Sequence, residues 1–459
     1  MIQSSEFRSL LKELTSLLSA KIPYSSALAM EKSSLTITID SKSRSIEERT
    51  YGTGTVFRAF NGSFFEELSV NSMTGESLAR EVRNFLPGLS QGSRGGHYDA
   101  VSYGTRDFLT PVMIDPRSVP LGEKIESLEN LKEVLMHLDS AIKDVQVSYR
   151  EAREFATFVD GGSDLHQEII RTHIVIVAFA NAEGKTVYEA LAQGGATGYE
   201  VLSFDAAEFE KLKDNLQALY RSDFITPGVY TVIMAPLVTG IIAHESFGHG
   251  VEMDLFLKRK SKARLYMHKE IASPLVTMKD DPSLPGCSGT YFFDDEGILS
   301  RPALIIDEGI LKGGLSDRAS AAALGVPATG NGRRESYARK VYARMSNTFI
   351  EPQHASIEDL MSLAGDGIYI DSPMGGMEDP QGWGIQVTAK IGREFRKGRF
   401  TGKVFSPLAI TGYVPDLLKS ISGVGSDFRM YPGTCGKGYK EMIPVGIGGP
   451  HILARCRLG

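Results

Sequence analysis

The chain contains few cysteines and no long apolar run. Its 459 residues include only three cysteines, Cys287, Cys435 and Cys456. Three thiols cannot form a disulfide framework, and an odd count is typical of a reducing compartment. No stretch approaches the roughly 18 consecutive apolar residues of a membrane-spanning helix, and residues 1–21 carry charges where a signal peptide is apolar. We therefore expect a cytoplasmic protein with no membrane partner.

The chain also lacks a surplus of positive charge. Its 50 Lys and Arg residues face 56 Asp and Glu residues, which gives a net charge of −6. Binding to nucleic acid without sequence preference depends on basic side chains gathered on one face. The basic run at residues 256–269 has few aromatic residues and is better explained as a solvated helix face or a lid. We expect no nucleic-acid partner.

The length of the chain exceeds what one hydrophobic core normally serves, so we expect two domains. The turn signal Ile-Thr-Pro-Gly at residues 225–228 follows a strong amphipathic helical pattern at 205–222. This divides the chain into an N-terminal α+β domain, residues 1–225, and a C-terminal domain, residues 226–459, that holds the metal-motif helix described below. Each domain should contain mostly antiparallel sheet with packed helices, because short turns between consecutive strands cannot produce parallel pairs.

Local patterns predict most elements of the N-terminal domain. Asn61-Gly62 joins two alternating runs, residues 52–60 and 63–70, and is the strongest short-range hairpin signal. Residues 87–118, with Arg94 and His97, are rich in Gly, Ser, Pro and Asp and predict an extended loop. The other predicted helices and strands are helices at 5–20, 74–86, 121–142 and 205–222, and strands at 35–40, 145–161, 166–182 and 184–195.

The segment IIAHESFGHG, residues 241–250, places His244, Glu245 and His249 in a run of small and apolar residues. Two imidazoles with a carboxylate beside the first are the parts of a hydrolytic zinc site. The imidazoles bind Zn²⁺, and the carboxylate takes a proton from the attacking water. His244 and His249 are therefore candidate metal ligands, and Glu245 is the candidate catalytic base. The alternative is a pair of unrelated core or surface histidines.

The spacing of the two histidines requires a distorted helix. In a regular α-helix, positions i and i+5 lie about 140° apart around the axis, too far to bind one metal ion. A π-type turn widens the helix and returns both positions to one face, and such turns are common at functional sites. Gly248 and Gly250 lie where the distortion must be absorbed, so we expect a π-type turn here.

Two other segments carry candidate functional residues. The pentapeptide Asp-Glu-Gly-Ile-Leu occurs at residues 295–299 and 307–311, and predicts that residues 290–315 form a meander of two hairpins. We therefore interpret Asp294, Asp295 and Glu296 as turn residues in preference to a carboxylate metal cluster.

The loop TGNGRRESYARK, residues 329–340, offers Arg333, Arg334 and Tyr337 as candidate substrate-binding residues, because guanidinium groups bind carboxylates and carbonyl oxygens. An interdomain salt-bridge loop is an equal alternative.

The C-terminal half resembles the TldD branch of the TldD/PmbA family of metallopeptidases. The likeness begins with HESFGHGVE and continues, in order, through FDDEG (293–297), TGNGRRESYA (329–338), RMSNTFI (344–350) and GTCGK (433–437). The PmbA branch lacks the His-Glu-x-x-x-His motif, so its presence indicates the TldD side. The chain departs from the family at residues 375–387, where GGMEDPQGWGIQV replaces a Gly-Gly-Gln-Val-Asp type stretch. An older family label, modulator of DNA gyrase, gains no support from the net charge.

The resemblance implies a zinc-dependent peptidase that acts on short or unfolded peptides. In the family, the cysteine of Gly-x-Cys-Gly-Lys is the third metal ligand, and Cys435 occupies that position. Lys437 lies close enough in sequence to lower the pKa of the Cys435 thiol. The resemblance also implies a homodimer, or a heterodimer with a PmbA-type relative. Two alternatives stay open: a non-catalytic binding partner stabilised by zinc, and a metal-dependent amidase acting on non-peptide substrates.

Overall fold

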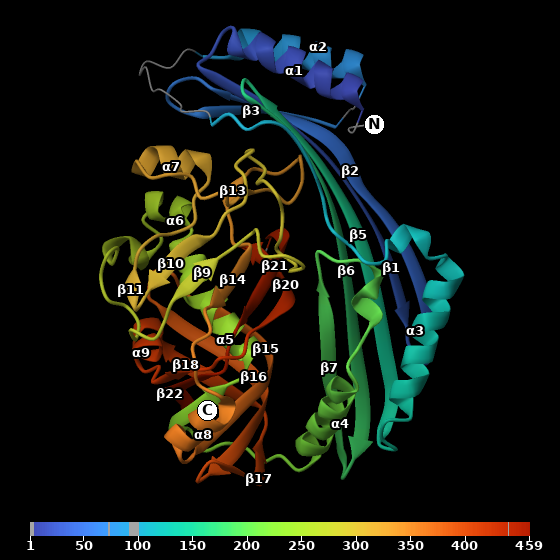
Figure 1. The fold of residues 1–459 in the computed structure, drawn as a ribbon, viewed down its shortest axis with the longest axis vertical. Helices are drawn as coiled ribbons and strands as arrows, with labels where there is room; N and C mark the ends of the chain where they lie inside the picture. Colours follow the sequence, from blue (N-terminus) through green and yellow to red (C-terminus); the bar gives the residue numbers. More distant parts are fainter. Residues whose placement is uncertain (1–3, 72–73, 91–100, 439) are drawn as a thin grey trace.

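The N-terminal half is built on one long, twisted sheet (Figure 1). The computed structural model describes residues 4–71, 74–90, 101–438 and 440–459. The strand order is β3-β2-β1-β5-β6-β4, with β7 also paired to β6. Antiparallel pairs join all neighbours except β4 and β6, which are parallel. The strands are β1 Tyr24–Ile39, β2 Arg44–Phe60, β3 Phe65–Val70, β4 Gly104–Leu109, β5 Ile142–Asp160, β6 Ser163–Ala182 and β7 Lys185–Gly195.

Four helices cover this sheet. Helices α1 (Ser5–Ser19) and α2 (Gly75–Phe85) lie across one end of the strands, and their apolar stripes pack on residues of β1, β2 and β5 (Figure 1). Helices α3 (Leu121–Met136) and α4 (Ala206–Tyr220) share a second core with β5 and β6. Burial of these stripes is the main stabilising contribution of the helices, because short helices are marginal on their own.

Most of the predicted N-terminal elements are present. The Asn61-Gly62 hairpin is confirmed, since Phe60 pairs with Phe65 and Gly62 has a φ of 95° that favours glycine. The predicted 121–142 helix ends at Met136, because Ile142 already belongs to β5. The prediction of a loop at residues 87–118 is wrong at residues 104–109, which form β4. β4 pairs with β6, which lies far away in sequence, so no local pattern indicates this strand. Arg94 and His97 lie outside the described residues.

The C-terminal half contains a small closed barrel. The path β15-β8-β22-β18-β16 is closed by pairing between β16 and β15, and β17 extends it beside β16. The pairs are antiparallel except for β8 with β15. The strands are β8 Gly228–Met234, β15 Gly367–Glu378, β16 Gly384–Arg396, β17 Arg399–Phe405, β18 Leu408–Tyr413 and β22 Ile452–Leu458, with β19 Gly423–Val424 paired to β22.

A second sheet lies beside the barrel, in the order β11-β10-β9-β14-β21-β20. Helix α5 (Pro236–Ala243) contributes to the core that the barrel and this sheet share. The strands are β9 Met278–Asp280, β10 Ala303–Asp307, β11 Ile310–Leu311, β14 Asn347–Ile350, β20 Arg429–Lys437 and β21 Lys440–Gly449. The remaining elements are helices α6 Met253–Leu257, α7 Arg318–Leu324, α8 Ile357–Ala364 and α9 Val414–Lys419, and the short pair β12 Gly332–Arg333 and β13 Tyr342–Ala343.

The predicted meander at residues 290–315 is confirmed at its second turn. There, β10 and β11 pair through Asp307 and Ile310 around the glycine. At the first turn, the amide of Asp294 donates to the carbonyl of Ile298 at 2.9 Å, and Phe293 and Leu299 form an isolated bridge instead of strands. Asp294 acts as a turn residue, because its carboxylate accepts from the amide of Glu296. The carboxylate of Glu296 pairs with Arg58 and accepts from the amide of Arg318.

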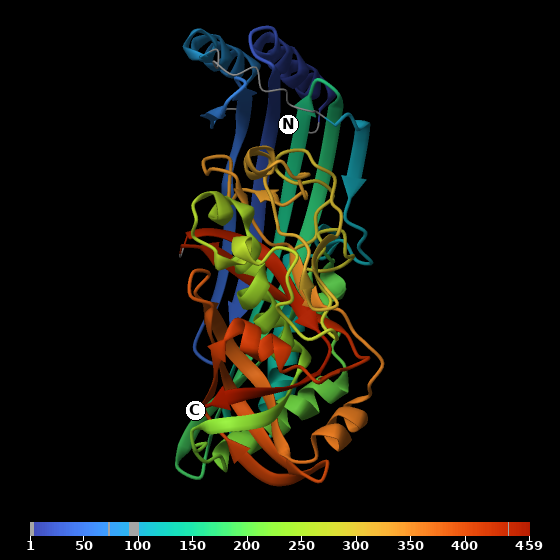
Figure 2. The ribbon, with the colours of Figure 1, turned by 90° about the vertical axis from the view of Figure 1, so that its left-hand side faces the viewer.

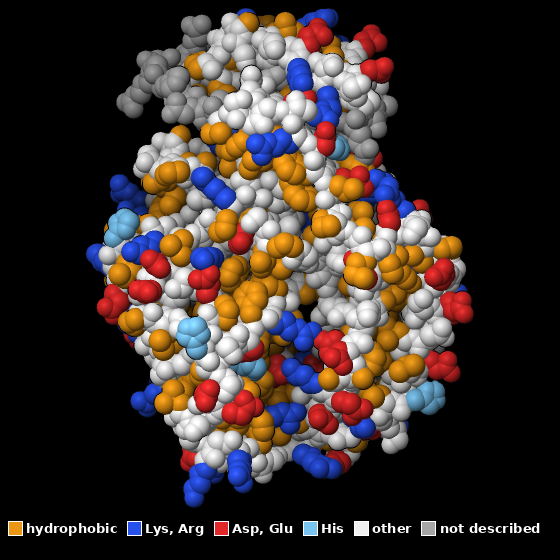
Figure 3. Space-filling view, viewed as in Figure 1, with side chains coloured by type: hydrophobic (Ala, Val, Ile, Leu, Met, Phe, Trp, Pro, Cys, Tyr) orange, Lys and Arg blue, Asp and Glu red, His pale blue; other side chains and the backbone are white. Residues whose placement is uncertain are grey.

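The C-terminal half packs along the long sheet, beside it in Figure 1 and in front of it in Figure 2. Phe293 from the C-terminal half enters an apolar cluster with Leu28, Phe158 and Leu165 of the sheet. Side chains of both charge signs are interspersed over the face drawn in Figure 3. Within the described residues, no helix has both the length and the apolar character that a membrane crossing needs. The domain boundary between residues 225 and 226 stays a prediction.

Candidate metal centre

Helix α5 ends in a π-type turn, as the histidine spacing predicts. The turn covers His244–Gly248, and the amide of His249 donates to the carbonyl of His244, five residues earlier. Phe247 leaves helical geometry, with φ −119° and ψ 17°. This widening brings the rings of His244 and His249 to 5.1 Å between centroids, with their planes 81° apart. Two residues that a regular helix would point apart therefore face the same space.

Glycine contacts place this turn beside the strand that carries Cys435. A Cβ added to Gly240 of α5 would lie 2.4 Å from the backbone nitrogen of Gly448 on β21, so the helix packs directly on the strand backbone. β21 pairs with β20, where Cys435 lies opposite Ile443. A Cβ on Gly248 would lie 2.1 Å from the sulfur of buried Met345. Close packing at both glycines determines where the histidines lie.

His244, His249 and Cys435 form one compact group of possible metal ligands. One ligand atom from each residue lies within 4.8 Å of the other two, and Cys435 Sγ is 3.3 Å from His249 Nε2. Within the described residues the group has no fourth member. The buried Nδ1 of His244 has no hydrogen-bond partner among them. Two imidazole nitrogens and a thiolate are the donor types that Zn²⁺ prefers, so these residues fit zinc.

The surroundings of Cys435 favour the thiolate form. Burial by itself would raise the pKa of the thiol, but hydrogen bonds with His244 and His249 outweigh it and lower the pKa to about 5. Arg344, which is 1 % exposed, donates to the Cys435 carbonyl at 2.9 Å and approaches its sulfur at 3.4 Å. By contrast, burial raises the pKa values of the Cys287 and Cys456 thiols to about 12. Cys435 is therefore the thiol best suited to a metal ligand.

Glu252, which sequence reasoning did not single out, lies behind His249. Its carboxylate is 3.5 Å from His249 Nδ1, 3.1 Å from Lys437 Nζ and 3.5 Å from Arg344 Nε. Burial opposes ionisation of Glu252, but Lys437 and His249 lower its pKa to about 2. A carboxylate behind a ligating histidine fixes the ring's orientation and tautomer. Lys437, expected to act on the thiol, instead pairs with Glu252 and with Asp254 at 2.7 Å.

Glu245 lies beside His244 and is half-buried. A Cβ added to Gly376 on β15 would lie 2.9 Å from Glu245 Cγ, so this glycine makes room for the side chain. No hydrogen bond ties the Glu245 carboxylate to another described residue, which leaves it available to a water or a substrate.

A second carboxylate, Glu378, lies at the end of β15 in the segment that departs from the family. Both of its oxygens are buried without a partner among the described residues. Burial raises its pKa to about 9. The departure at residues 375–387 was the only sequence signal that pointed to this position.

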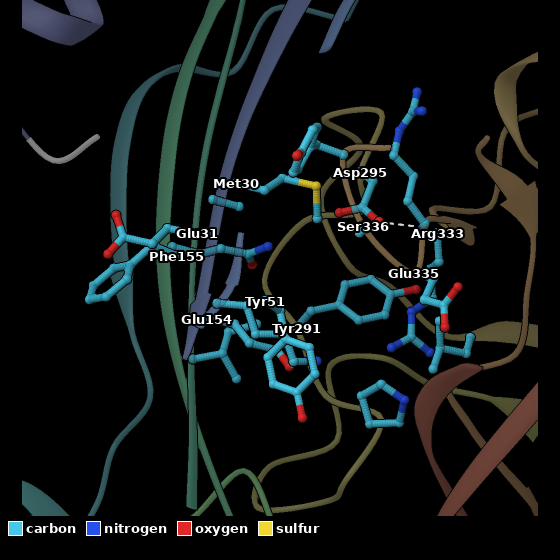
Figure 4. A pocket seen from close by; sticks show the side chains of 18 of the residues that line it. Met30, Glu31, Tyr51, Glu154, Phe155, Tyr291, Asp295, Arg333, Glu335 and Ser336 are labelled. Atoms are coloured by element: carbon cyan, nitrogen blue, oxygen red, sulfur yellow. Dashed lines mark hydrogen bonds and ion pairs between the residues drawn. The ribbon is translucent and has the colours of Figure 1, made fainter. Parts of the chain in front are cut away.

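Arg333, Arg334 and Tyr337 lie at the interface between the two halves and not in the metal group. All three line a cavity of about 90 Å³. Figure 4 shows side chains from the long sheet and from the 333–336 loop around it. Arg333 Nη1 donates to the Met345 carbonyl at 2.7 Å, and Arg334 forms an ion pair with Glu67 of β3 at 2.8 Å. Arg334 therefore fits the alternative of an interdomain salt-bridge loop. Among the described residues, no hydrogen bond or ion pair connects Arg333, Arg334 or Tyr337 to the metal group.

A buried group of three ligands with a carboxylate beside it is the arrangement of a metal-dependent hydrolase. Comparison with known proteins agrees with that class. Residues 227–456 match the PmbA/TldA metallopeptidase C-terminal domain, and residues 114–220 match the central domain of the same family. The chain therefore belongs to the PmbA/TldA metallopeptidase family.

Individual relatives carry related names. A metalloprotease of Methanocaldococcus jannaschii is 32% identical over 348 residues, 73% of this chain and 74% of the relative. A Saccharolobus solfataricus protein named zinc metalloprotease TldD homolog is 30% identical over 347 residues, 72% of this chain and 75% of the relative. The fold is shared with a Thermotoga maritima protein described as a candidate modulator of DNA gyrase, with TM-score 0.77, 17% identity and 99% of each chain covered.

Proposed function

We propose that the chain is a zinc-dependent peptidase in which His244, His249 and Cys435 hold the metal and Glu245 is the general base. The observation that carries the proposal is the π-type turn, which brings both histidines to Cys435. His249 and Cys435 meet there although they lie 186 residues apart in sequence. Three protein ligands leave one coordination position for water or substrate, whereas structural zinc sites normally have four protein ligands. The absence of a fourth ligand among the described residues favours catalysis over a purely structural zinc.

The chain's own residues would share the work of peptide hydrolysis. Zinc, when bound, acts as a Lewis acid that polarises a carbonyl group and acidifies water. Glu245 takes a proton from the attacking water and returns it to the leaving amine. Glu252 keeps His249 oriented, and Arg344 fixes the backbone of Cys435. Arg333, Arg334 and Tyr337 stay candidates for substrate binding only at the interface cavity that they line.

The proposed substrates are short or unfolded peptides, the substrate class that the family resemblance implies. Relatives named metalloprotease support peptide substrates in general. Assembly as a homodimer, or with a PmbA-type partner, and a cytoplasmic location remain part of this proposal.

The decisive experiment combines metal content with hydrolysis of an unstructured peptide library. We expect about one zinc per chain, cleavage of library peptides, and loss of cleavage after chelation that added zinc reverses. Zinc without cleavage of any peptide would support the structural alternative. Cleavage confined to non-peptide amides would support the amidase alternative.

A further inference from the structure

Glu378 has a buried carboxyl group that forms no ion pair with any described residue. It is the last residue of β15, opposite Ile385 of β16. Its Oε1 lies 3.8 Å from the position of a Cβ on Gly250, the residue after His249. Neither carboxylate oxygen has a hydrogen-bond partner among the described residues. Burial of an unpaired carboxylate is costly, so the protein retains this side chain at the expense of its own stability.

The charges around Glu378 would attract a cation. Apart from His249, which acts on it with the opposite sign, the charged groups that act on Glu378 are the acidic side chains of Glu245, Asp379 and Glu252. Glu252 is neutralised by Lys437 and Arg344, but among the described residues no ion pair neutralises Glu245 or Glu378. The amide of Lys262 donates to the carbonyl of Pro380, two residues after Glu378, but its ammonium group donates to the Tyr413 hydroxyl at 2.8 Å.

The segment after Glu378 holds it rigidly. Asp379 accepts from the amides of Gln381 and Gly382 at 3.0 and 2.9 Å, and its carbonyl accepts from the amide of Trp383. Trp383 is fully buried, and its ring meets that of Phe247 in the π-type turn at 5.6 Å. The divergent segment is thus anchored directly on the turn that presents the histidines.

We propose that Glu378 binds a cationic nitrogen of the substrate beside the scissile bond, either the α-ammonium group or a Lys or Arg side chain. This inference rests on the proposed function. Such a group would supply the charge-assisted hydrogen bonds that both carboxylate oxygens lack. Glu378 does not belong to the group of metal ligands, so it is free for this role. The site would therefore prefer positively charged peptides over neutral peptides of the same length.

Binding can be measured without turnover in a zinc-loaded Glu245→Gln background. Two peptide pairs separate the two sources of charge: one pair differs by acetylation of the α-amino group, and the other, acetylated in both members, exchanges lysine for norleucine. We expect the cationic member of at least one pair to bind roughly 10- to 100-fold more tightly, by calorimetry. Trp383, the only tryptophan, gives an independent fluorescence signal on the same segment.

Adding Glu378→Gln should abolish this preference while zinc content stays unchanged. Glu358→Gln, which removes an exposed carboxylate on α8, is the matched control and should keep the preference.

Equal binding of both members in both pairs would overturn the inference, and so would a preference that survives Glu378→Gln. Loss of zinc in that variant would make Glu378 a ligand and would also overturn it. If the variant fails to fold, the two peptide pairs on the Glu378-containing protein still decide whether a cation is preferred. A cation preference without hydrolysis of any peptide by the unmodified protein would contradict the proposed function and leave this inference standing.

Discussion

Two of the three proposed ligands in the metal group have a neighbour that controls their charge. Cys435 gains its thiolate character from the two histidines, and His249 is backed by Glu252. Glu245 has neither an ion pair nor a hydrogen bond among the described residues, as a base that must meet water requires. Removing a ligand and removing the base should therefore have different effects.

Glu245→Gln should keep the shape of the site and its zinc while removing the base. General acid–base catalysis contributes typically 10²–10⁴-fold, so peptide hydrolysis should fall by about that factor at unchanged zinc content. Steady-state kinetics and metal analysis of the same preparation measure both quantities. Joint loss of zinc and activity would make Glu245 a ligand or a structural anchor, and full activity with zinc retained would place the base elsewhere.

Cys435→Ser should lower bound zinc strongly, because a serine hydroxyl is a poor ligand beside a thiolate. Cys287→Ser and Cys456→Ser are matched controls and should retain zinc, since neither thiol lies in the ligand group. Metal analysis after dialysis compares the three variants. Equal zinc retention in all of them would remove Cys435 from the site.

At the scale of secondary-structure elements, the metal group depends on how closely α5 packs on β21. The contact between Gly240 and Gly448 brings the helix against the strand next to β20, and the π-type turn then directs both histidines toward Cys435. The helix supplies two proposed ligands and the hairpin β20–β21 supplies the third. Any shift between these two elements should open the group.

Gly240→Ala should therefore weaken zinc binding although residue 240 touches no ligand. The added methyl group would meet backbone atoms that cannot move aside, so the helix must shift; overpacking of this kind typically costs about 1–3 kcal/mol of stability. Gly122→Ala in α3 is the control, because open space surrounds that position and alanine is the better helix former. Urea unfolding and zinc titration of both variants measure the effect, and unchanged zinc affinity in Gly240→Ala would show that the packing does not position the site.

At the scale of the whole molecule, buried charges join the two halves. Arg58 of β2 pairs with Glu67 at 2.7 Å and with Glu296 of the C-terminal half, and Arg334 reaches back to Glu67. The side chains of Arg58 and Glu296 are 6 % and 0 % exposed. Breaking a buried pair leaves an uncompensated charge, so this network makes the relative position of the halves specific.

Arg58→Met should lower the free energy of unfolding by about 3–5 kcal/mol, because Glu296 and Glu67 lose their shared partner. Arg49→Met on the same strand is the control, since its pair with Glu47 is exposed and should matter little. Urea denaturation followed by circular dichroism compares the variants. A loss as small as that of the control would mean that the network contributes nothing to stability.

His173 should make stability depend on pH. It lies on β6 and its Nε2 is 3.0 Å from the Ser288 hydroxyl of the other half. Burial, followed by Arg171 and Arg150, lowers its pKa to about 4, whereas an unfolded histidine titrates near pH 6.5. Between these values the unfolded chain binds the extra proton, so this residue's contribution to stability falls as pH falls, by up to about 1.4 kcal/mol per pH unit.

His173→Gln should flatten the loss of stability between pH 7.5 and pH 5 relative to the unmodified protein, by about 2 kcal/mol. Urea unfolding at both pH values measures it. His137→Gln, at an exposed position at the end of α3, should leave the slope unchanged. An identical slope in the His173 variant would contradict the assignment.

The sequence by itself determined the features that depend on neighbouring residues. The i, i+5 spacing of His244 and His249 required a π-type turn, and alternation with Asn61-Gly62 specified a hairpin. These follow because backbone geometry and turn chemistry act over a few residues. The residues alone left Cys435 open as a ligand, and only family resemblance pointed to it.

Tertiary structure decided which distant segments meet. It closed the barrel through β8, β15 and β22, paired β4 with β6 in parallel, and brought Cys435 to within 3.3 Å of His249. It also placed Glu378 beside the metal group and Arg334 at the domain interface. Such contacts depend on how whole surfaces pack. A local sequence pattern shows that a face of an element is apolar, but it does not show which distant segment packs on that face.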